Sequence, residues 1–150
     1  MLAGMDKMEN ALGLNSSAIV LDEETQKAME GLYKQALDNR DKYLWYTNWQ
    51  IILNDGNISV GSACFKGAPG ITGEVEIGYG LNDNYRGRGY MAEAIKAIVT
   101  WALEQEGVFR VVAETDKKNI ASQKVLWRSG FCRYKEEGEC LYWCRTKLPD

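Results

Sequence analysis

A glycine-rich turn separates a strand-like segment from the most regular helical segment of the sequence. The turn reads Arg86-Gly87-Arg88-Gly89, and the residues after it carry apolar side chains at helical spacing. Glycines at such a junction expose backbone N–H groups at the positive end of the helix dipole, and the arginines add charge. The turn therefore predicts an anion site, suited to a phosphate. The alternative is that the glycines only shape the turn and the arginines are solvated.

Hydrophobic periodicity predicts an α/β domain of three layers, with a mixed, mainly antiparallel central sheet flanked by helices. We expect the helix that begins at Arg88 on one face of the sheet and the helix that begins at Asp22 on the other. The tryptophans are expected to face inward or to lie at the edge of a cleft. The expected elements are a helix at 22–40, strands at 43–53, 58–66 and 74–81, a helix from 88 to 106, a strand at 110–115, a helix at 119–129 and two strands within 131–147.

Length and composition favour one domain over residues 1–150, since a chain of this size with 45% hydrophobic residues can bury a sufficient core. The net charge of −3 argues against a broad nucleic-acid interface. No apolar run approaches the ~20 residues of a membrane span, and the opening residues lack the apolar core of a signal peptide. We therefore expect a soluble, cytoplasmic protein that binds neither nucleic acid nor membrane.

The absence of histidine restricts the possible chemistry. Without histidine there is no Ser-His-Asp or Cys-His arrangement, and the four cysteines contain no CxxC pair that would indicate a zinc site. Any general base must be a carboxylate, Tyr, Lys, Cys or a positioned water. We expect no metal and reduced cysteines, as is usual in the cytosol.

A dinucleotide fingerprint is one alternative interpretation of the same turn. The pattern Gly87-x-Gly89-x-x-Ala92 is compatible with that fingerprint. Glu114 lies 25 residues after Gly89, where an acid that binds ribose could lie. However, the turn follows an antiparallel meander, and only 61 residues remain after Gly89. That is too short for the other half of a dinucleotide-binding domain.

Three segments together resemble the GNAT superfamily of N-acetyltransferases, and most closely its ribosomal-protein-alanine acetyltransferase branch. They are GEVEIGYGL (73–81), YRGRGYMAEA (85–94) and NIASQKVLWRSGF (119–131), in the order and at the separations typical of that family. The resemblance is strong over 73–131, extends more loosely back to Trp49 and fades before it. It implies a GNAT fold and an enzyme that uses acetyl-CoA as acyl donor.

The resemblance also implies where the coenzyme binds. The family's Arg-x-x-Gly-x-Gly/Ala pattern maps to Arg86, Gly89 and position 91, where this chain has Met91 in place of a small residue. A helical Met91 can aim its side chain at the core and leave its N–H free. Residues expected to contact the coenzyme are Tyr79, Leu81, Arg86, Gly87, Arg88, Gly89, Tyr90, Met91, Ala92, Asn119 and Ser122.

Asn119 and Ser122 match the family's Asn-x-x-Ser positions, which the resemblance places beside the pantetheine arm and thioester. The simpler alternative is that Asn119 is a helix N-cap and Ser122 faces its first turn. The backbone N–H of Tyr79 is expected to polarise the thioester carbonyl.

A carboxylate on the strand at 74–81 is the expected general base. An amine must lose protons to attack a thioester carbonyl, and Glu76 lies beside the expected cleft, with Glu74 second on the same face. The alternative is that these glutamates pair with basic residues on neighbouring strands. The family's usual tyrosine acid is absent from 125–128, so the acid is unassigned: Ser122, Tyr134 or water would protonate the leaving thiolate, or the thiolate departs without a dedicated acid.

The expected reaction is transfer of an acetyl group to a primary amine by direct attack in a ternary complex. The acceptor is a protein N-terminus, an amino acid or a small-molecule amine. A non-catalytic acyl-CoA sensor is the second alternative. The sequence opens on a helical pattern where the resemblance predicts a first strand, so we expect a bare sheet edge that a partner subunit covers in a homodimer.

Overall fold

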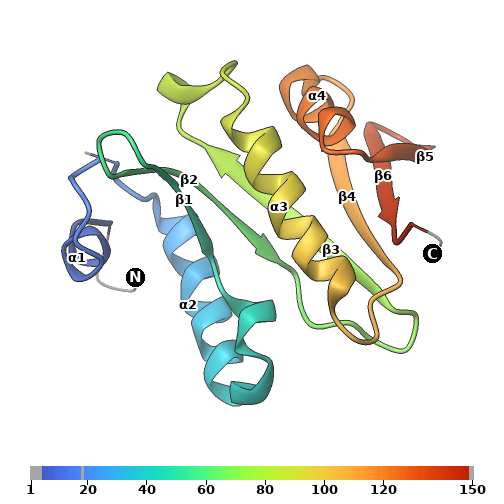
Figure 1. The fold of residues 1–150 in the computed structure, drawn as a ribbon, viewed down its shortest axis with the longest axis horizontal. Coiled ribbons are helices and arrows are strands. Elements are labelled where there is room, and N and C mark those ends of the chain that lie inside the picture. Colours follow the sequence, from blue (N-terminus) through green and yellow to red (C-terminus); the bar gives the residue numbers. More distant parts are fainter. Residues whose placement is uncertain (1–4, 18, 149–150) are drawn as a thin grey trace.

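The computed structural model describes residues 5–17 and 19–148, which form a six-stranded sheet with helices on both faces (Figure 1). In chain order the elements are α1 (Met5–Ala11), α2 (Glu23–Asp38), η1 (Arg40–Tyr46), β1 (Trp49–Leu53), β2 (Ile58–Phe65), β3 (Glu74–Leu81), η2 (Asp83–Tyr85), α3 (Tyr90–Glu104), β4 (Arg110–Asp116), α4 (Ile120–Arg128), β5 (Cys132–Glu137) and β6 (Cys140–Thr146).

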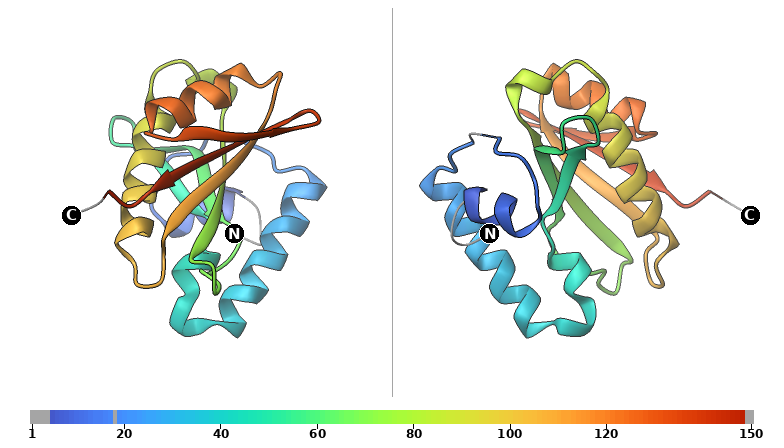
Figure 2. Two further views of the ribbon diagram at one scale, coloured as in Figure 1. Left: turned by 90° about the vertical axis from the view of Figure 1, so that its right-hand side faces the viewer. Right: turned by 60° about the vertical axis from the view of Figure 1, so that its left-hand side comes forward.

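The strand order is β1-β2-β3-β4-β6-β5, and only the β3–β4 pair is parallel. The helices α3 and α4 cover one face, while α1 and α2 lie on the other (Figure 2). The prediction of a three-layer, mainly antiparallel α/β domain is confirmed. The described residues before β1 add only one isolated bridge, between Asn15 and Ile58.

Helix α2 forms for local reasons but covers its face of the sheet only loosely. The Asp22 side chain accepts a hydrogen bond from the Thr25 backbone N at 2.7 Å, and Lys27 pairs with Glu23 one turn away at 2.8 Å. None of its side chains is buried, and its main neighbour is η1. The helix therefore lies on the expected side of the sheet, but it does not pack on the sheet as had been predicted.

The expected strand from 43 to 53 is only half correct. Residues 40–46 form η1, and the strand begins at Trp49. Trp45 is 7% exposed and stacks near Phe65 and Trp101, with ring centroids 5.0 Å from each. A short alternating pattern does not distinguish a strand from a helical turn. Here the packing of Trp45 against Phe65 and Trp101 favours the helical turn. Trp127 also departs from expectation, because it is 72% exposed on α4.

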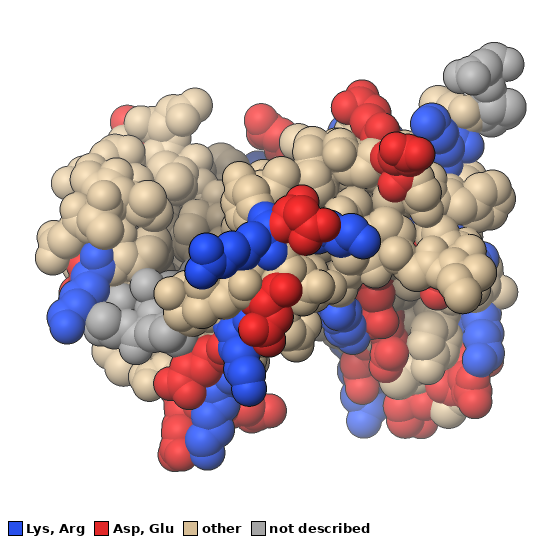
Figure 3. All heavy atoms as spheres, turned by 90° about the horizontal axis from the view of Figure 1, so that it is seen from below, with Lys and Arg blue, Asp and Glu red and all other residues tan. Residues whose placement is uncertain are grey.

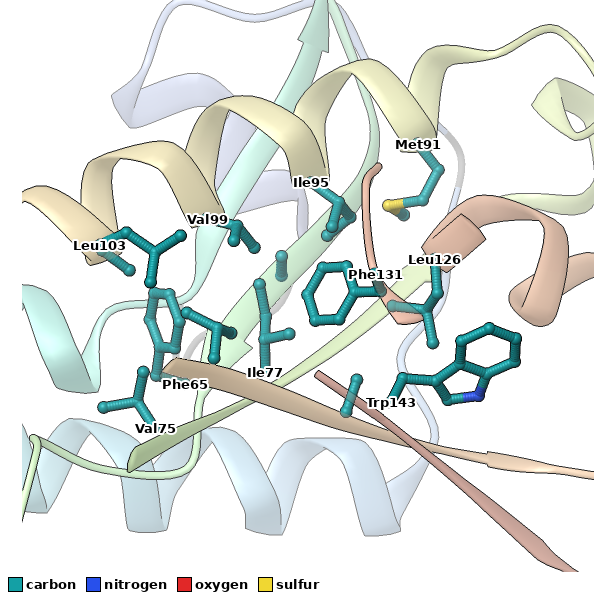
Figure 4. Packing of buried hydrophobic residues seen from close by; sticks show 14 of the residues in the cluster. Phe65, Val75, Ile77, Met91, Ile95, Val99, Leu103, Leu126, Phe131 and Trp143 are labelled. Carbon is teal, nitrogen blue, oxygen red and sulfur yellow. The ribbon is translucent and has the colours of Figure 1, made fainter. Parts of the chain in front are cut away.

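The main core lies between the sheet and α3 (Figure 4). Ile95 and Val99 of α3 are fully buried one helical turn apart, and they face the strands that carry Phe65 and Val111. Met91, near the start of α3, points its side chain into this core and is 4% exposed. Met91 therefore anchors the first turn of α3 to the core.

Acidic and basic side chains are interspersed on the underside of the molecule, without a broad field of either sign (Figure 3). On this face any strong electrostatic preference must therefore come from local groups. Among the described residues, no helix has the length and apolar character needed to cross a bilayer.

Candidate functional site

A gap between β3 and β4 opens halfway along the sheet. The two strands pair only over Glu74–Glu76 and Arg110–Val112, although β3 continues to Leu81 and β4 to Asp116. Beyond Glu76, β3 stays paired with β2 on its other side, through Leu81 and Gly61. The edge of β3 toward β4 is therefore open over its last residues.

The backbone of β3 offers hydrogen-bonding groups to this gap. Lys66 N donates to Glu76 O at 2.9 Å and Asn82 N donates to Val60 O at 2.8 Å, so the even-numbered residues direct their backbone groups toward β2. Backbone direction alternates along a strand, and the groups of Tyr79 and Leu81 therefore point into the gap. In the described part of the chain no strand pairs with them there. They could bind an extended ligand as an added strand would.

The glycine-rich turn lies at the same end of β3. Gly87 and Gly89 have φ of 76° and 84°, which a side chain rarely tolerates, and neither has an atom within 4 Å of an added Cβ. Gly89 is the N-cap of α3 and has no side chain to cap the helix. The first N–H groups of α3 are thus available to an anion, and the helix dipole favours negative charge there.

The two arginines of the turn point to different places. Arg86 pairs with Asp83 at 3.0 Å and lines the cavity described below. Arg88 stacks over the Tyr85 ring at 5.9 Å and lines a different hollow, between β1 and α3. The structure therefore does not bring Arg88 together with the other predicted coenzyme contacts.

Helix α4 forms the opposite wall. The Asn119 side chain accepts a hydrogen bond from Ser122 N at 3.1 Å, so it caps the helix as the simpler alternative proposed. Buried Ser129 ties α4 to α3, because its Oγ donates toward Val125 O at 2.7 Å and Ala92 O at 3.1 Å. The cap does not exclude a ligand contact, since Asn119 and Ser122 also line the cavity.

These elements enclose a cavity of about 440 Å³ between β3, the glycine-rich turn, α3 and α4. Ten of the eleven predicted coenzyme contacts line it, and Arg88 alone lies elsewhere. Glu76 is not part of the lining. The predicted residues that line it are Tyr79, Leu81, Arg86, Gly87, Gly89, Tyr90, Met91, Ala92, Asn119 and Ser122.

Tyr79 and Ser122 meet inside the cavity. The Tyr79 hydroxyl lies 2.7 Å from Ser122 Oγ and 3.2 Å from the Ser122 carbonyl oxygen. Burial raises the pKa of Tyr79 to about 12, although the hydrogen bond with Ser122 acts in the opposite direction. The phenol therefore keeps its proton throughout the physiological range. Tyr134, the tyrosine that the sequence analysis considered as an acid, lies on β5 beside Arg110 and Tyr142 and outside the cavity.

Two basic residues of α4 were not identified from the sequence. Lys124 and Arg128 lie four residues apart on the helix and both line the cavity, where with Arg86 they supply positive charge. Their four-residue spacing places them together on one side of α4, but helical periodicity does not place them on the side of Ser122, so the spacing alone did not indicate them. The cavity thus combines free N–H groups, an apolar floor and three cations, which suits a ligand with phosphates at one end.

The candidate carboxylates lie on the sheet face opposite α3. Glu76 pairs with Lys66. Glu74 pairs with Arg110, whose Nε lies 2.6 Å from the Glu74 carboxylate. Both glutamates therefore pair with basic residues on neighbouring strands, as the alternative interpretation stated. Glu114 lies on β4 two residues beyond Val112, where the gap begins. Alternation places it on the Arg110 face of the sheet. Its hydrogen bond raises the pKa of the Cys140 thiol.

Glu114 is a carboxylate that sequence reasoning weighed only as a ribose-binding acid. In the part of the chain that the structure describes, no basic side chain forms an ion pair with it. The two-residue periodicity of 110–116 could have placed it on the face of Glu76. Glu76 and Glu114 are thus the two carboxylates that flank the start of the gap.

Comparison with known protein families gives one match over most of the chain. The acetyltransferase (GNAT) domain matches residues 17–132. The chain is 35% identical to the uncharacterized N-acetyltransferase YjdG of Bacillus subtilis over 65% of its own length and 58% of that protein. It is 31% identical to YnaD of Bacillus subtilis, over 81% of this chain and 66% of that protein. The chain therefore spans less than two thirds of either relative.

Solved structures share the fold at lower identity. The ribosomal-protein-S5-alanine acetyltransferase of Vibrio fischeri superposes with a TM-score of 0.57 and 20% identity, covering 63% of this chain and 58% of that one. RimL, a ribosomal L7/L12 alpha-N-protein acetyltransferase solved with coenzyme A, gives a TM-score of 0.63 and 20% identity, covering 85% and 74%. These likenesses show a shared fold.

Proposed function

Because the chain belongs to the GNAT acetyltransferase family, we propose that it transfers an acetyl group from acetyl-CoA to a primary amine. The amine attacks the thioester directly, with both substrates bound. One observation carries the proposal: the open backbone edge of β3 and the left-handed glycine-rich turn line the same cavity as Ser122. That combination suits a ligand with amides along one part and a pyrophosphate at the other.

The donor would lie along the cavity from α3 to the gap. The N–H groups of Gly87, Gly89 and the first turn of α3 bind the pyrophosphate, with Arg86 close by. The backbone groups of Tyr79 and Leu81 pair with the pantetheine amides, as an added strand would. Met91 supports this assignment, because its side chain is in the core and leaves its backbone accessible.

The chemical step places the thioester at the gap between β3 and β4. Glu76 acts as the base that takes a proton from the amine, directly or through a water. The Tyr79 N–H polarises the thioester carbonyl, and Ser122 donates to the departing sulfur. Support for Ser122 is its place in the cavity, and support for Glu76 is its place at the last paired position of β3 before the gap.

The acceptor would approach from the other side of β3. A second cavity of about 420 Å³ shares Gly80 and Leu81 with the first and is also lined by α2, β1 and β2. Its lining has one carboxylate, Asp83, whose ion-pair partner Arg86 lies outside the lining, and no basic side chain, which suits an amine. A protein N-terminus, an amino acid or a small-molecule amine would meet these requirements.

We also propose a cytoplasmic homodimer. All four cysteines are unpaired, which is typical of a reducing compartment. The outer edge of β1 ends the sheet and is unpaired among the described residues, and a partner subunit would cover it. A single monomeric mass in solution at micromolar concentration would contradict the dimer.

Isothermal titration with acetyl-CoA tests the donor assignment. Wild-type protein should bind at micromolar concentration, and the variant Gly89→Glu should lose binding, because it adds bulk and negative charge where the pyrophosphate lies. Titration with NAD is the control, and preference for NAD would favour the dinucleotide alternative. Absence of acetyl-CoA binding by the wild type would overturn the proposal, and binding without turnover on any amine would leave an acyl-CoA sensor.

A further inference from the structure

The hydroxyl groups of Tyr79 and Ser122 can share their two protons in two ways. In one arrangement Tyr79 donates to the Ser122 carbonyl oxygen at 3.2 Å, and Ser122 Oγ donates to the Tyr79 oxygen at 2.7 Å. In the other, Tyr79 donates to Ser122 Oγ. Only the second arrangement leaves the Ser122 proton free to point into the cavity, because each hydroxyl has a single proton.

We infer that Tyr79 is a positioning residue that turns the Ser122 hydroxyl toward the sulfur of the departing coenzyme A. The inference rests on the proposed function, since it concerns the same cavity and the same reaction. A phenol that donates to Ser122 Oγ polarises the Ser122 O–H bond, and a chain of two donors stabilises a developing negative charge better than one. The sequence alone assigned Tyr79 only a backbone role.

The step balances without a further reactant. When the tetrahedral intermediate collapses, the bond between the acyl carbon and sulfur breaks and sulfur keeps the electron pair. The Ser122 hydroxyl donates a hydrogen bond to the thiolate, and Tyr79 donates to Ser122. Neither residue changes its net protonation, and the thiolate is released or takes a proton from water. The amine loses its proton to the base, and the products are an amide and coenzyme A.

The surroundings of the pair suit this role. Tyr79 extends from β3 toward α4, while Arg86 from the glycine-rich turn and Lys124 and Arg128 from α4 line the same cavity. Tyr90 of α3 is the other titratable group of the lining, and no carboxylate belongs to it. The lining therefore offers a thiolate hydroxyl donors from β3 and α4 and cations from the turn and α4. Within this lining, the hydroxyl groups of Tyr79 and Ser122 are already in contact.

Burial explains why a tyrosine serves as a constant donor. Tyr79 is packed against the core, and its hydroxyl is held between the Ser122 carbonyl and Oγ. Such a phenol keeps its proton at any pH at which the protein works. The Tyr79 phenol therefore acts without ionising, and its effect on the departing sulfur should depend on its contact with Ser122.

The experiment measures the thiol pKa of coenzyme A bound to the protein, from thiolate absorbance against pH, so that no acceptor is needed. The variants are Tyr79→Phe, Ser122→Ala and the double variant. The matched control is Tyr43→Phe, which removes an exposed hydroxyl of η1. Loss of one hydrogen bond should raise the bound thiol pKa by about half a unit to one unit in either single variant.

The double variant decides whether Tyr79 acts through Ser122. If Tyr79 acts through Ser122, the double variant should show the same thiol pKa as Ser122→Ala. If the two residues act independently, the pKa increases of the two single variants should add in the double variant. Equal thiol pKa values in the wild type and Tyr79→Phe would overturn the inference and leave the proposed function intact. Failure of the wild type to bind coenzyme A would overturn both. Thermal unfolding of Tyr79→Phe checks that the fold is retained, because phenylalanine keeps the ring that packs in the core.

Discussion

Lys66 holds Glu76 through both backbone and side chain. Its backbone N donates to Glu76 O at 2.9 Å across β2 and β3, and its ammonium pairs with the Glu76 carboxylate. The contact uses Oε1, which leaves the second oxygen of the carboxylate for another partner. The pair therefore holds the Glu76 carboxylate next to the gap between β3 and β4, where the proposed reaction requires a base.

This relationship predicts the behaviour of Glu76→Gln. The amide keeps the size of the side chain but cannot accept a proton, so kcat should fall by about 10²-fold or more. Affinity for acetyl-CoA should stay within about twofold, because Glu76 does not line the donor cavity. Steady-state kinetics with a reactive amine and titration with acetyl-CoA measure the two quantities.

Glu114→Gln is the matched comparison, because Glu114 lies on the other strand that borders the gap. If Glu76 is the base, Glu114→Gln should retain most of the wild-type kcat. The opposite result, with the large loss in Glu114→Gln, would move the role of base to β4. Equal and small losses in both variants would show that neither carboxylate is the base.

Gly61→Ala should destabilise the protein although it adds one methyl group. An added Cβ at Gly61 would overlap the Gly80 carbonyl oxygen of β3, which is backbone and cannot rotate away. We expect a loss of about 1–3 kcal/mol in the free energy of unfolding. Gly78→Ala is the control, because an added Cβ there has no neighbour within 4 Å, and its stability should change by less than about 0.5 kcal/mol. Urea denaturation followed by fluorescence measures both, and equal stabilities would contradict this packing.

Thr115→Val should leave a buried donor without an acceptor. The Trp143 Nε1 donates to Thr115 Oγ1 at 3.0 Å, and both side chains are buried. Removing the acceptor should cost about 1–3 kcal/mol of stability. Thr100→Val removes a hydroxyl that donates to Lys96 O and accepts from Arg145 Nη2 at 3.4 Å, and it should cost less because both contacts are exposed to water. A smaller loss for Thr115→Val than for Thr100→Val would show that the indole finds another partner.

Tyr79 should make stability depend on pH in the alkaline range. Its pKa is about 12 in the folded protein against 10.0 ordinarily, so the unfolded chain releases this proton first as pH rises. The unfolded state then binds fewer protons, and stability falls with increasing pH between 10.0 and about 12. In Tyr79→Phe the fall over this range should be smaller. Chemical denaturation at several alkaline pH values tests it, and identical slopes in the two proteins would contradict the assigned burial.

Local features of the chain were predictable from the sequence because they depend on neighbours along the chain. The turn between the strands predicted at 43–53 and 58–66, the helix that begins near Asp22 and the helix after Gly89 follow from turn glycines and periodicity. The order of the three motifs also predicted the family, and with it most of the lining of the cavity.

Other features depend on segments that meet only in the folded protein. Tyr79 and Ser122 are 43 positions apart, and their contact requires β3 and α4 to face one cavity. The pairing of Glu76 with Lys66 depends on the register of β2 against β3, and the burial of Trp45 depends on Phe65 and Trp101. Side-chain pattern indicates which face of an element is apolar, but it does not specify which distant group lies opposite.

The sequence by itself therefore determined the helices α2, α3 and α4, most strands, the glycine-rich turn and the family, because propensity, periodicity and motif spacing are properties of the local chain. Tertiary structure decided that β3 and β4 separate after Glu76, that Arg88 turns away from the cavity while Lys124 and Arg128 enter it, and that a tyrosine hydroxyl contacts Ser122. These outcomes follow from strand register and helix packing, which depend on contacts summed over the whole core.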